Sequence, residues 1–311
     1  MSTASIPASS TYSTIVRVCD TAIKLVTRAY FHSLSHLHPD GARRHAERLF
    51  TTPPRHAKHY PVAAAARRLT VLSEAGHLAV WQAGPDGAPA VVLVHGWGGV
   101  GAQLGGFVAP LLARGFRVVW FDHPGHGESE GHQSALPDMV RGLTAVAATC
   151  GPFHSAVGHS IGAATIALAL RGGLPLQRAV LIGAPASIGD YMRSFARMIG
   201  ISGEVRERLR LAIEARYGRK MDELDRIEDL GRLDTPTLLF HDSNDRHVPF
   251  AHAQRIAGHL RRSHLVNTHG LGHYRILRDL SVIGETMRFL TEAAPHPPKH
   301  LPELPVPAPL L

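Results

Sequence analysis

The sequence has only two cysteines, Cys19 and Cys150, among its 311 residues. Two cysteines are too few for a disulfide framework, and neither stands at the spacing of a metal-binding motif. Such sparse use of cysteine is typical of proteins in a reducing compartment. The sequence therefore excludes a disulfide-stapled secreted domain and favours a cytoplasmic location.

Long apolar runs are also missing. The sequence contains no stretch of about 18 uninterrupted apolar residues, the length that a membrane-spanning helix needs. Residues 15–31 lack the apolar centre of a signal peptide, because Arg17, Asp20, Lys24 and Arg28 interrupt them. Their apolar side chains recur at helical spacing, which predicts an amphipathic helix docked on the protein's own body. Two alternatives stay open. One is weak peripheral contact of this helix with a membrane surface, and the other is an organellar transit peptide, which the acid-free start resembles in composition.

The chain lacks a block of basic residues, although 33 Lys and Arg against 25 Asp and Glu give a net charge of +8. The arginines are spread along the chain, so we expect no nucleic-acid partner. The glycine-rich run after His95 has neither of the two spacings that cradle phosphates, G-x-G-x-x-G and G-x-x-x-x-G-K. These absences argue against a nucleotide or nucleic-acid function.

From Arg67 onward, strand-like and helix-like segments alternate. Expected strands lie at 67–73, 78–83, 90–95, 117–122, 153–157, 179–183, 237–241 and 264–268, and helical patterns at 103–113, 137–149, 161–171, 250–260 and 279–291. Continuously apolar runs such as 91–94 are typical of a parallel sheet covered on both faces. We expect a doubly wound, mostly parallel eight-stranded α/β sheet with helices on both faces, whose first two strands form a hairpin.

One interval between strands is longer than a crossover needs and contains helical patterns at 191–199 and 204–217. It follows the carboxyl end of a strand, where ligands bind in open α/β sheets. We therefore expect a small helical cap insertion at about 186–234, with an ordinary helical decoration as the alternative.

These features divide the chain into three expected parts. Residues 1–60 form an N-terminal helical extension, and residues 61–293 form the α/β domain that carries the cap. Residues 295–311 contain seven prolines, which suit neither helix nor sheet, so we expect a disordered tail at 294–311.

The pentapeptide Gly158-His159-Ser160-Ile161-Gly162 stands between a strand-like and a helix-like run. Glycine on each side of a serine at this spacing allows a sharp strand-to-helix turn that exposes the hydroxyl. The turn also places Ser160 at a helix N-terminus, where free backbone N–H groups favour developing negative charge. Ser160 is therefore the candidate nucleophile, and helix capping is its alternative role.

Five motifs in order carry a resemblance to a known family: His95-Gly96-Trp97-Gly98, Asp122-His123-Pro124-Gly125-His126-Gly127-Glu128-Ser129, Gly158-His159-Ser160-Ile161-Gly162, Asp245 before Val248-Pro249, and Gly272-His273. With these motifs the chain resembles the α/β-hydrolase superfamily, in particular its serine esterase and lipase-like members. The resemblance covers roughly residues 67–290. It implies that an acid and then a histidine follow the serine in the chain.

The resemblance assigns the acid to Asp245 and the base to His273. An aspartate three residues before Val-Pro matches the family pattern, whereas the rival Asp242 is expected to cap a turn. His273 matches the family's Gly-x-Gly-His, and His269 is expected to be at most its neighbour. The serine needs such a base, and the base needs an acid that fixes its tautomer.

Acyl transfer also needs backbone donors for the developing oxyanion. The N–H of Ile161, directly after the nucleophile, is one expected donor. The resemblance implies that Trp97 supplies the other, and glycines beside it allow close backbone approach. Because His123 and His126 have no carboxylate or cysteine cluster beside them, we expect a structural turn there and no metal.

We therefore expect a cofactor-independent serine hydrolase that cleaves small-molecule carboxylic esters through an acyl-enzyme. Alternatives are an acyltransferase or thioesterase using the same residues, and a non-catalytic ligand-binding module that keeps the fold.

Overall fold

The computed structural model describes residues 9–54, 60 and 66–292, with side chains from residue 22 onward. The described residues divide by packing into two compact units. We call them the helical unit (residues 9–50 and 188–223) and the α/β unit (residues 51–54, 60, 66–187 and 224–292). The predicted proline-rich tail lies outside the described residues.

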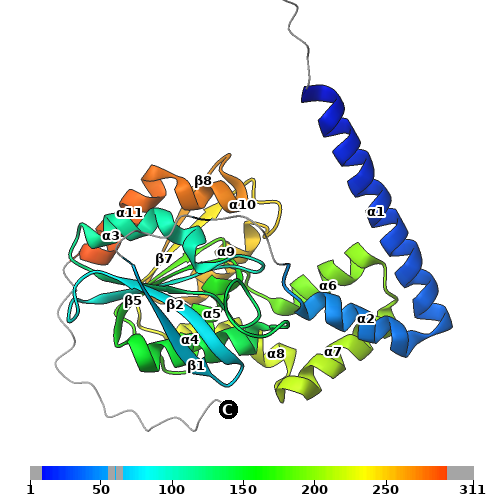
Figure 1. Ribbon diagram of the computed structural model, residues 1–311, viewed down its shortest axis with the longest axis horizontal. Coiled ribbons are helices and arrows are strands. Elements are labelled where there is room, and N and C mark those ends of the chain that lie inside the picture. The colour runs from blue at the N-terminus through cyan, green and yellow to red at the C-terminus, as the bar shows by residue number, and fades with distance from the viewer. Residues whose placement is uncertain (1–8, 55–59, 61–65, 293–311) are drawn as a thin grey trace, which may run out of the picture. The chain divides into compact units, whose positions relative to one another are not determined.

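The α/β unit is built on one β-sheet (Figure 1). The sheet has eight strands in the order β1-β2-β4-β3-β5-β6-β7-β8. The strands are β1 (Arg67–Ser73), β2 (Gly76–Ala83), β3 (Ala90–Val94), β4 (Arg117–Phe121), β5 (Phe153–His159), β6 (Arg178–Ile182), β7 (Thr237–Asp242) and β8 (Ser263–Thr268). β1 and β2 form an antiparallel hairpin, β2 pairs antiparallel with β4, and all other pairs are parallel. The predicted fold class and edge hairpin are confirmed.

Helices cover both faces of the sheet (Figure 1). One apolar cluster joins the sheet to α4 (Leu136–Cys150), α5 (Ile161–Arg171), η2 (Ile227–Arg232) and α9 (Ala251–His259). A second cluster joins the other face to η1 (Gly101–Phe107), α3 (Val108–Leu112), η3 (Ile276–Arg278) and α11 (Leu280–Thr291). Every residue of β3 is buried, as its continuous apolar run requires when helices pack on both sides.

The helical unit combines two segments that are far apart in the sequence. Its helices are α1 (Ser9–Leu37), α2 (Pro39–Thr51), α6 (Ile188–Ile199) and α7 (Gly203–Tyr217), and α8 (Met221–Leu224) begins at its end. They share a small core: Phe31, Ala46, Met192, Phe195, Ile199, Leu209, Ile213 and Met221. The Ser202 N–H donates to the Ser35 hydroxyl at 3.2 Å, which ties the two segments together. The expected extension and most of the expected cap insertion thus pack as one body.

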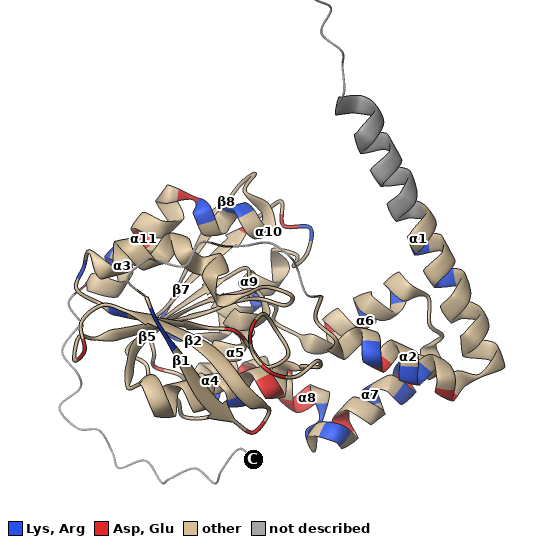
Figure 2. Ribbon diagram, in the orientation of Figure 1, with Lys and Arg blue, Asp and Glu red and all other residues tan. Residues whose placement is uncertain are grey.

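Charges of both signs alternate along α7 of the helical unit (Figure 2). Arg210, for example, pairs with Glu207 and Glu214 on the same helix. The Arg208 guanidinium also reaches the Asp40 carboxylate of α2 at 2.8 Å. The Arg208–Asp40 pair is exposed, and Arg210 and Glu214 are only half-buried. Such pairs contribute little to stability, so the apolar core holds the unit together.

One predicted helix differs from the observed segment. The pattern at 103–113 predicts a single helix, but the chain forms the 3₁₀ segment η1 and then the short helix α3. Gly105 and Gly106 lie at the end of η1, and glycine is a poor α-helix former. Among the described residues, no helix has the length and apolar character needed to cross a membrane.

Candidate active site

Ser160 occupies a strained turn between β5 and α5. It is the one described residue other than glycine with a positive φ, with φ 54° and ψ −126°. Its N–H donates to the Ile182 carbonyl at the end of β6, and its carbonyl accepts the N–H of Ala163. The turn therefore fixes the Ser160 backbone at the carboxyl edge of the sheet while leaving its side chain at the start of α5.

The two glycines of this turn are required by close packing. A Cβ on Gly158 would lie 2.6 Å from Cδ1 of Ile166, and one on Gly162 would lie 2.3 Å from the His95 carbonyl oxygen. Both distances are shorter than any normal contact. Side chains at these positions would push α5 away from β5 and β3, so the sequence pattern around Ser160 follows directly from the geometry.

His273 and Asp245 meet at the same edge of the sheet. His273 is the second residue of α10 (Gly272–Arg275) after β8, and Asp245 lies in the loop after β7. Nδ1–H of His273 donates to Oδ2 of Asp245 at 2.6 Å. Both side chains are almost fully buried, at 4% and 2% exposure. Because Nδ1 carries the proton in this bond, Nε2 is the nitrogen left to accept one.

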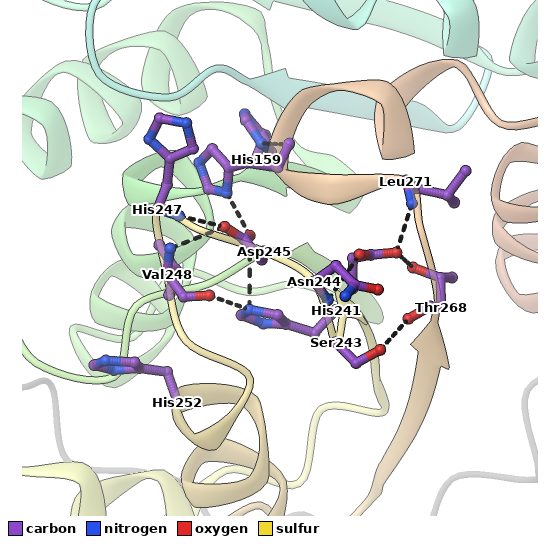
Figure 3. A network of polar contacts seen from close by, with 12 residues as sticks. His159, His241, Ser243, Asn244, Asp245, His247, Val248, His252, Thr268 and Leu271 are labelled. Atoms are coloured by element: carbon purple, nitrogen blue, oxygen red, sulfur yellow. Dashed lines mark hydrogen bonds and ion pairs between the residues drawn. The ribbon is translucent and has the colours of Figure 1, made fainter.

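The Asp245 carboxylate lies in a network of polar contacts (Figure 3) that favours its charged form. Burial alone would raise its pKa, but the hydrogen bond and charge of His273 and the N–H groups of Val248 and His247 lower the pKa below its ordinary value. Those two N–H groups donate to Oδ1 at 2.9 and 2.7 Å. The loop thus fixes both carboxylate oxygens, so Asp245 can orient and charge-stabilise His273.

Asp242 and His269, the alternatives to Asp245 and His273, have other partners. Asp242 accepts hydrogen bonds from the N–H of Asn244, the Thr268 hydroxyl and the N–H of Leu271. It therefore ties β7 to β8 and to the loop that leads into His273. The exposed His269 contacts the Ser243 hydroxyl at 3.0 Å.

His273 reaches the serine turn through His159, the residue before Ser160. Nε2–H of His159 donates to the His273 carbonyl at 2.8 Å, and the two ring centroids lie 4.6 Å apart. A Cβ on Gly183, which follows β6, would lie 3.3 Å from Nδ1 of His273. The structure thus brings His273 and Asp245 to the strand ends beside Ser160.

The loop after β3 lies against the serine from the other side. A Cβ on Gly96 would lie 3.0 Å from Cβ of Ser160, so Trp97 is one residue from direct contact with the serine turn. Within the described residues, the Trp97 N–H has no acceptor. The N–H of Ile161 lies in the first turn of α5, where helical N–H groups have no acceptor within the helix. Two free donors therefore flank the serine.

Three histidines beside His273 or Asp245 are absent from the predicted site. His159 is buried and its pKa falls to about 3, chiefly through desolvation. His241 is buried under Asp245, and its Nε2–H donates to the Val248 carbonyl at 2.8 Å (Figure 3). The His247 ring lies 5.0 Å from that of His273. Only His159 carries a sequence signal, because it lies inside the serine pentapeptide.

His95, His123 and His126 form a second cluster beneath the β3 loop. Each ring is bonded to backbone: His95 to the Gly96 carbonyl, His123 to the His95 carbonyl and His126 to the Pro124 carbonyl. Burial lowers the pKa of His123 to about 3, so the ring is neutral at pH 7. These contacts show a structural role for the turn.

Asp122 anchors the same turn. Its carboxylate accepts the N–H of Gly101 at 2.7 Å and of Glu128 at 2.8 Å. Burial is the largest influence on this group and raises its pKa to about 6, in spite of these two hydrogen bonds. The oxyanion loop candidate therefore rests on a rigid base of histidine and aspartate contacts to backbone.

The resemblance of the chain to the α/β-hydrolase superfamily is confirmed by comparison with known proteins. Residues 89–199 match the sequence profile of the family described as alpha/beta hydrolase fold. No curated protein sequence matches the chain.

Solved structures show the same fold. An esterase of Pyrococcus furiosus has a TM-score of 0.60 at 16% identity, covering 79% of this chain and 98% of its own. An esterase of Rhodococcus sp. ECU1013 has a TM-score of 0.54 at 20% identity, covering 73% and 99%. The 2-hydroxy-6-oxo-6-phenylhexa-2,4-dienoate hydrolase of Rhodococcus sp. strain RHA1 has a TM-score of 0.55 at 20% identity, covering 73% and 100%. At these identities the likeness extends to the fold alone.

Proposed function

This chain has the α/β-hydrolase fold, and we propose that it is a serine hydrolase that cleaves carboxylic esters through an acyl-enzyme. The observation that carries the proposal is the 2.6 Å bond between His273 and Asp245, both buried, beside a serine with a strained positive φ. A nucleophile, a base and an acid that orients the base are the parts that acyl transfer requires.

In the proposed reaction, Oγ of Ser160 attacks the ester carbonyl carbon while its proton passes to Nε2 of His273. The carbonyl oxygen becomes an oxyanion, which the N–H groups of Trp97 and Ile161 stabilise. Collapse of this tetrahedral intermediate breaks the bond to the alkoxy oxygen, and His273 returns the proton to the leaving alcohol.

Deacylation repeats the sequence with water. His273 takes a proton from the water, the hydroxide attacks the acyl carbon, and the Ser160 oxygen leaves with the proton that His273 holds. Asp245 stabilises the imidazolium in both halves and needs no proton itself. Every group that moves a proton belongs to the chain, so the proposal includes no cofactor.

Esterase neighbours of the same fold support the ester as substrate class. Sparse cysteine, with Cys150 free and buried, supports a cytoplasmic location for the proposed enzyme.

Covalent labelling tests this function. A fluorophosphonate probe should label the wild-type chain on Ser160, and the chain should hydrolyse p-nitrophenyl esters. Ser160→Ala should abolish labelling and lower kcat by at least about 10⁴. Ser281→Ala, which alters an exposed serine on α11, is the matched control and should keep both activities.

Other outcomes assign the other functions. Labelling without hydrolysis, together with ester exchange into an added alcohol, would point to an acyltransferase, and faster turnover of thioesters would point to a thioesterase. Folded protein that shows neither labelling nor turnover would contradict the proposal and leave a ligand-binding module.

A further inference from the structure

A cavity of about 400 Å³ lies in the α/β unit between the loop after β3 and the segment after β8. Its volume is in the range of small-molecule sites. The residues that line it are Tyr60, Trp97, Gly98, Gly99, Val100, Gln103, Tyr274, Arg275, Leu277 and Arg278.

The cavity adjoins the candidate active site through two residues. Trp97 carries one of the free N–H groups beside Ser160, and Tyr274 directly follows His273. The ring centroids of His273 and Tyr274 lie 5.1 Å apart. A substrate whose reacting carbonyl lies against the Trp97 N–H can therefore extend its remaining atoms into this cavity.

The charge of the lining has one sign. Among the described residues that line the cavity, Arg275 and Arg278 are cationic and none is acidic. The Arg275 guanidinium already donates to the carbonyls of Leu271 and Gly270 in its own loop. Arg278, in contrast, has no hydrogen bond or ion pair within the described part of the chain. Its donors are available to a ligand.

Two phenols complete the polar lining. Burial, helped by the charge of Asp245 and by Tyr60, raises the pKa of Tyr274 above its ordinary value. The Tyr274 hydroxyl is therefore protonated at neutral pH and able to donate a hydrogen bond. A positive guanidinium beside neutral donors suits an oxyanion such as a carboxylate or phosphate.

We propose that this cavity binds an anionic group of the substrate, a carboxylate or a phosphate, and that Arg278 is the residue that selects it. The inference rests on the proposed function for its link to turnover. It makes the natural substrate an ester whose acyl part ends in a negative charge, and it gives Arg278 a role in specificity, outside the chemical step.

Three esters of p-nitrophenol test the selection: the butyrate, the glutarate half-ester, which ends in a carboxylate, and the 4-phosphonobutyrate. We expect kcat/KM for at least one anionic ester to exceed that for the butyrate by about tenfold. Arg278→Gln should remove this preference by raising KM for the anionic esters more than KM for the butyrate, and Arg278→Lys should restore part of the preference. The better of the two anionic esters identifies carboxylate or phosphate as the favoured group.

Arg288→Gln is the matched control, because Arg288 is exposed on α11 and does not line the cavity. This variant should keep the preference for the anionic ester. Since Arg278 is exposed, about 1 M salt should shrink the preference in the wild-type chain. Equal turnover of all three esters, or equal losses in the Arg278 and Arg288 variants, would overturn the inference.

A binding measurement separates this inference from the proposed function. Calorimetry on Ser160→Ala compares the mono-p-nitroanilide of glutaric acid with the p-nitroanilide of butyric acid. Tighter binding of the glutaric derivative, lost in the added Arg278→Gln, supports the anion site even if no ester is turned over. Equal affinity for the two anilides refutes it even if the chain is an active esterase.

Discussion

The α/β unit and the helical unit bury side chains of different kinds. The α/β unit buries six histidines: His95, His123, His126, His159, His241 and His273. Among the described residues of the helical unit, Ser35 is the one buried polar residue, and the remaining core is apolar. The α/β unit thus contains a dense polar network, whereas the core of the helical unit is held by apolar contacts that do not depend on pH.

This difference bears on the stability of the candidate site. Buried neutral imidazoles are stable only while they stay unprotonated, because charging them inside the protein is unfavourable. Their hydrogen bonds to backbone hold the loops around Ser160 in one arrangement, which is the preorganisation that oxyanion stabilisation needs. The apolar core of the helical unit provides no such preorganisation and is not sensitive to protonation. Substitutions and changes of pH should therefore affect the two units differently.

The largest expected effect comes from the network's central acid. Asp245→Asn removes the charge that stabilises the imidazolium and disturbs the His273 tautomer, so kcat should fall by about 10³ to 10⁴. The Tm should change little, because the amide oxygen can still accept the backbone N–H groups. Ester kinetics and thermal unfolding measure the two effects.

Asp242→Asn provides the contrast. Asp242 ties β7 to β8 and the following loop, so its loss should lower the Tm more than Asp245→Asn does and should lower kcat less. If kcat falls as much in Asp242→Asn as in Asp245→Asn, Asp245 is not the only acid that orients His273, and the assignment is wrong.

The position of Asp245 was predictable because its signal is local. Val248 stands three positions after it, and that spacing lets one carboxylate oxygen accept the N–H groups of His247 and Val248 while the other faces His273. The serine turn is equally local, since Gly158 and Gly162 meet atoms within a few ångströms. In motifs of this kind, the residues that fix the geometry lie within the motif itself. The catalytic roles of these residues stay predictions until they are measured.

Other features depend on packing between distant segments, which no local pattern contains. The sequence does not reveal that α1 and α2 share a core with α6 and α7, because Phe31 and Phe195 look like apolar positions of separate helices. The buried positions of His159 and His241 also follow from the assembled sheet edge. With 22 histidines in the chain, residue type could not single these two out.

The next largest expected effect is the destabilisation of the α/β unit in acid. The folded-state pKa of His123 and of His159 is about 3, below the ordinary 6.5, because of desolvation. Between these values the unfolded chain binds more protons, so stability falls as the pH falls from about 6.5 toward 3. At pH 5 each histidine should destabilise by about 2 kcal/mol relative to pH 7.5.

Chemical denaturation across this pH range measures the effect. His123→Gln should flatten the dependence of the unfolding free energy on pH, whereas His264→Gln, at a side chain that is 72% exposed, should leave it unchanged. The same slope in wild type and His123→Gln would show that His123 does not supply this sensitivity.

A cavity in the core of the helical unit should lower its stability by an amount that does not depend on pH. Phe195→Ala removes a ring that lies 5.1 Å from that of Phe50, and it should destabilise the unit by about 3 kcal/mol. Because the core contains no titratable side chain, the loss should be equal at pH 7.5 and pH 5.5. Circular dichroism during denaturation measures it, and exposed Met198→Ala is the control. A larger loss of unfolding free energy at pH 5.5 than at pH 7.5 would contradict the proposed difference between the two units.

The smallest expected effect compares one helix cap from each unit. The Ser202 hydroxyl accepts the N–H of Val205 at the start of α7, and the Asp279 carboxylate accepts those of Ser281 and Val282 at the start of α11. Replacement by alanine should cost about 1 kcal/mol for Ser202 and slightly more for Asp279, since a charged cap also interacts with the helix dipole. Amide hydrogen exchange in the first turn of each helix measures these losses. Equal losses in the two helices would mean that the charge of Asp279 adds nothing to its hydrogen bonds.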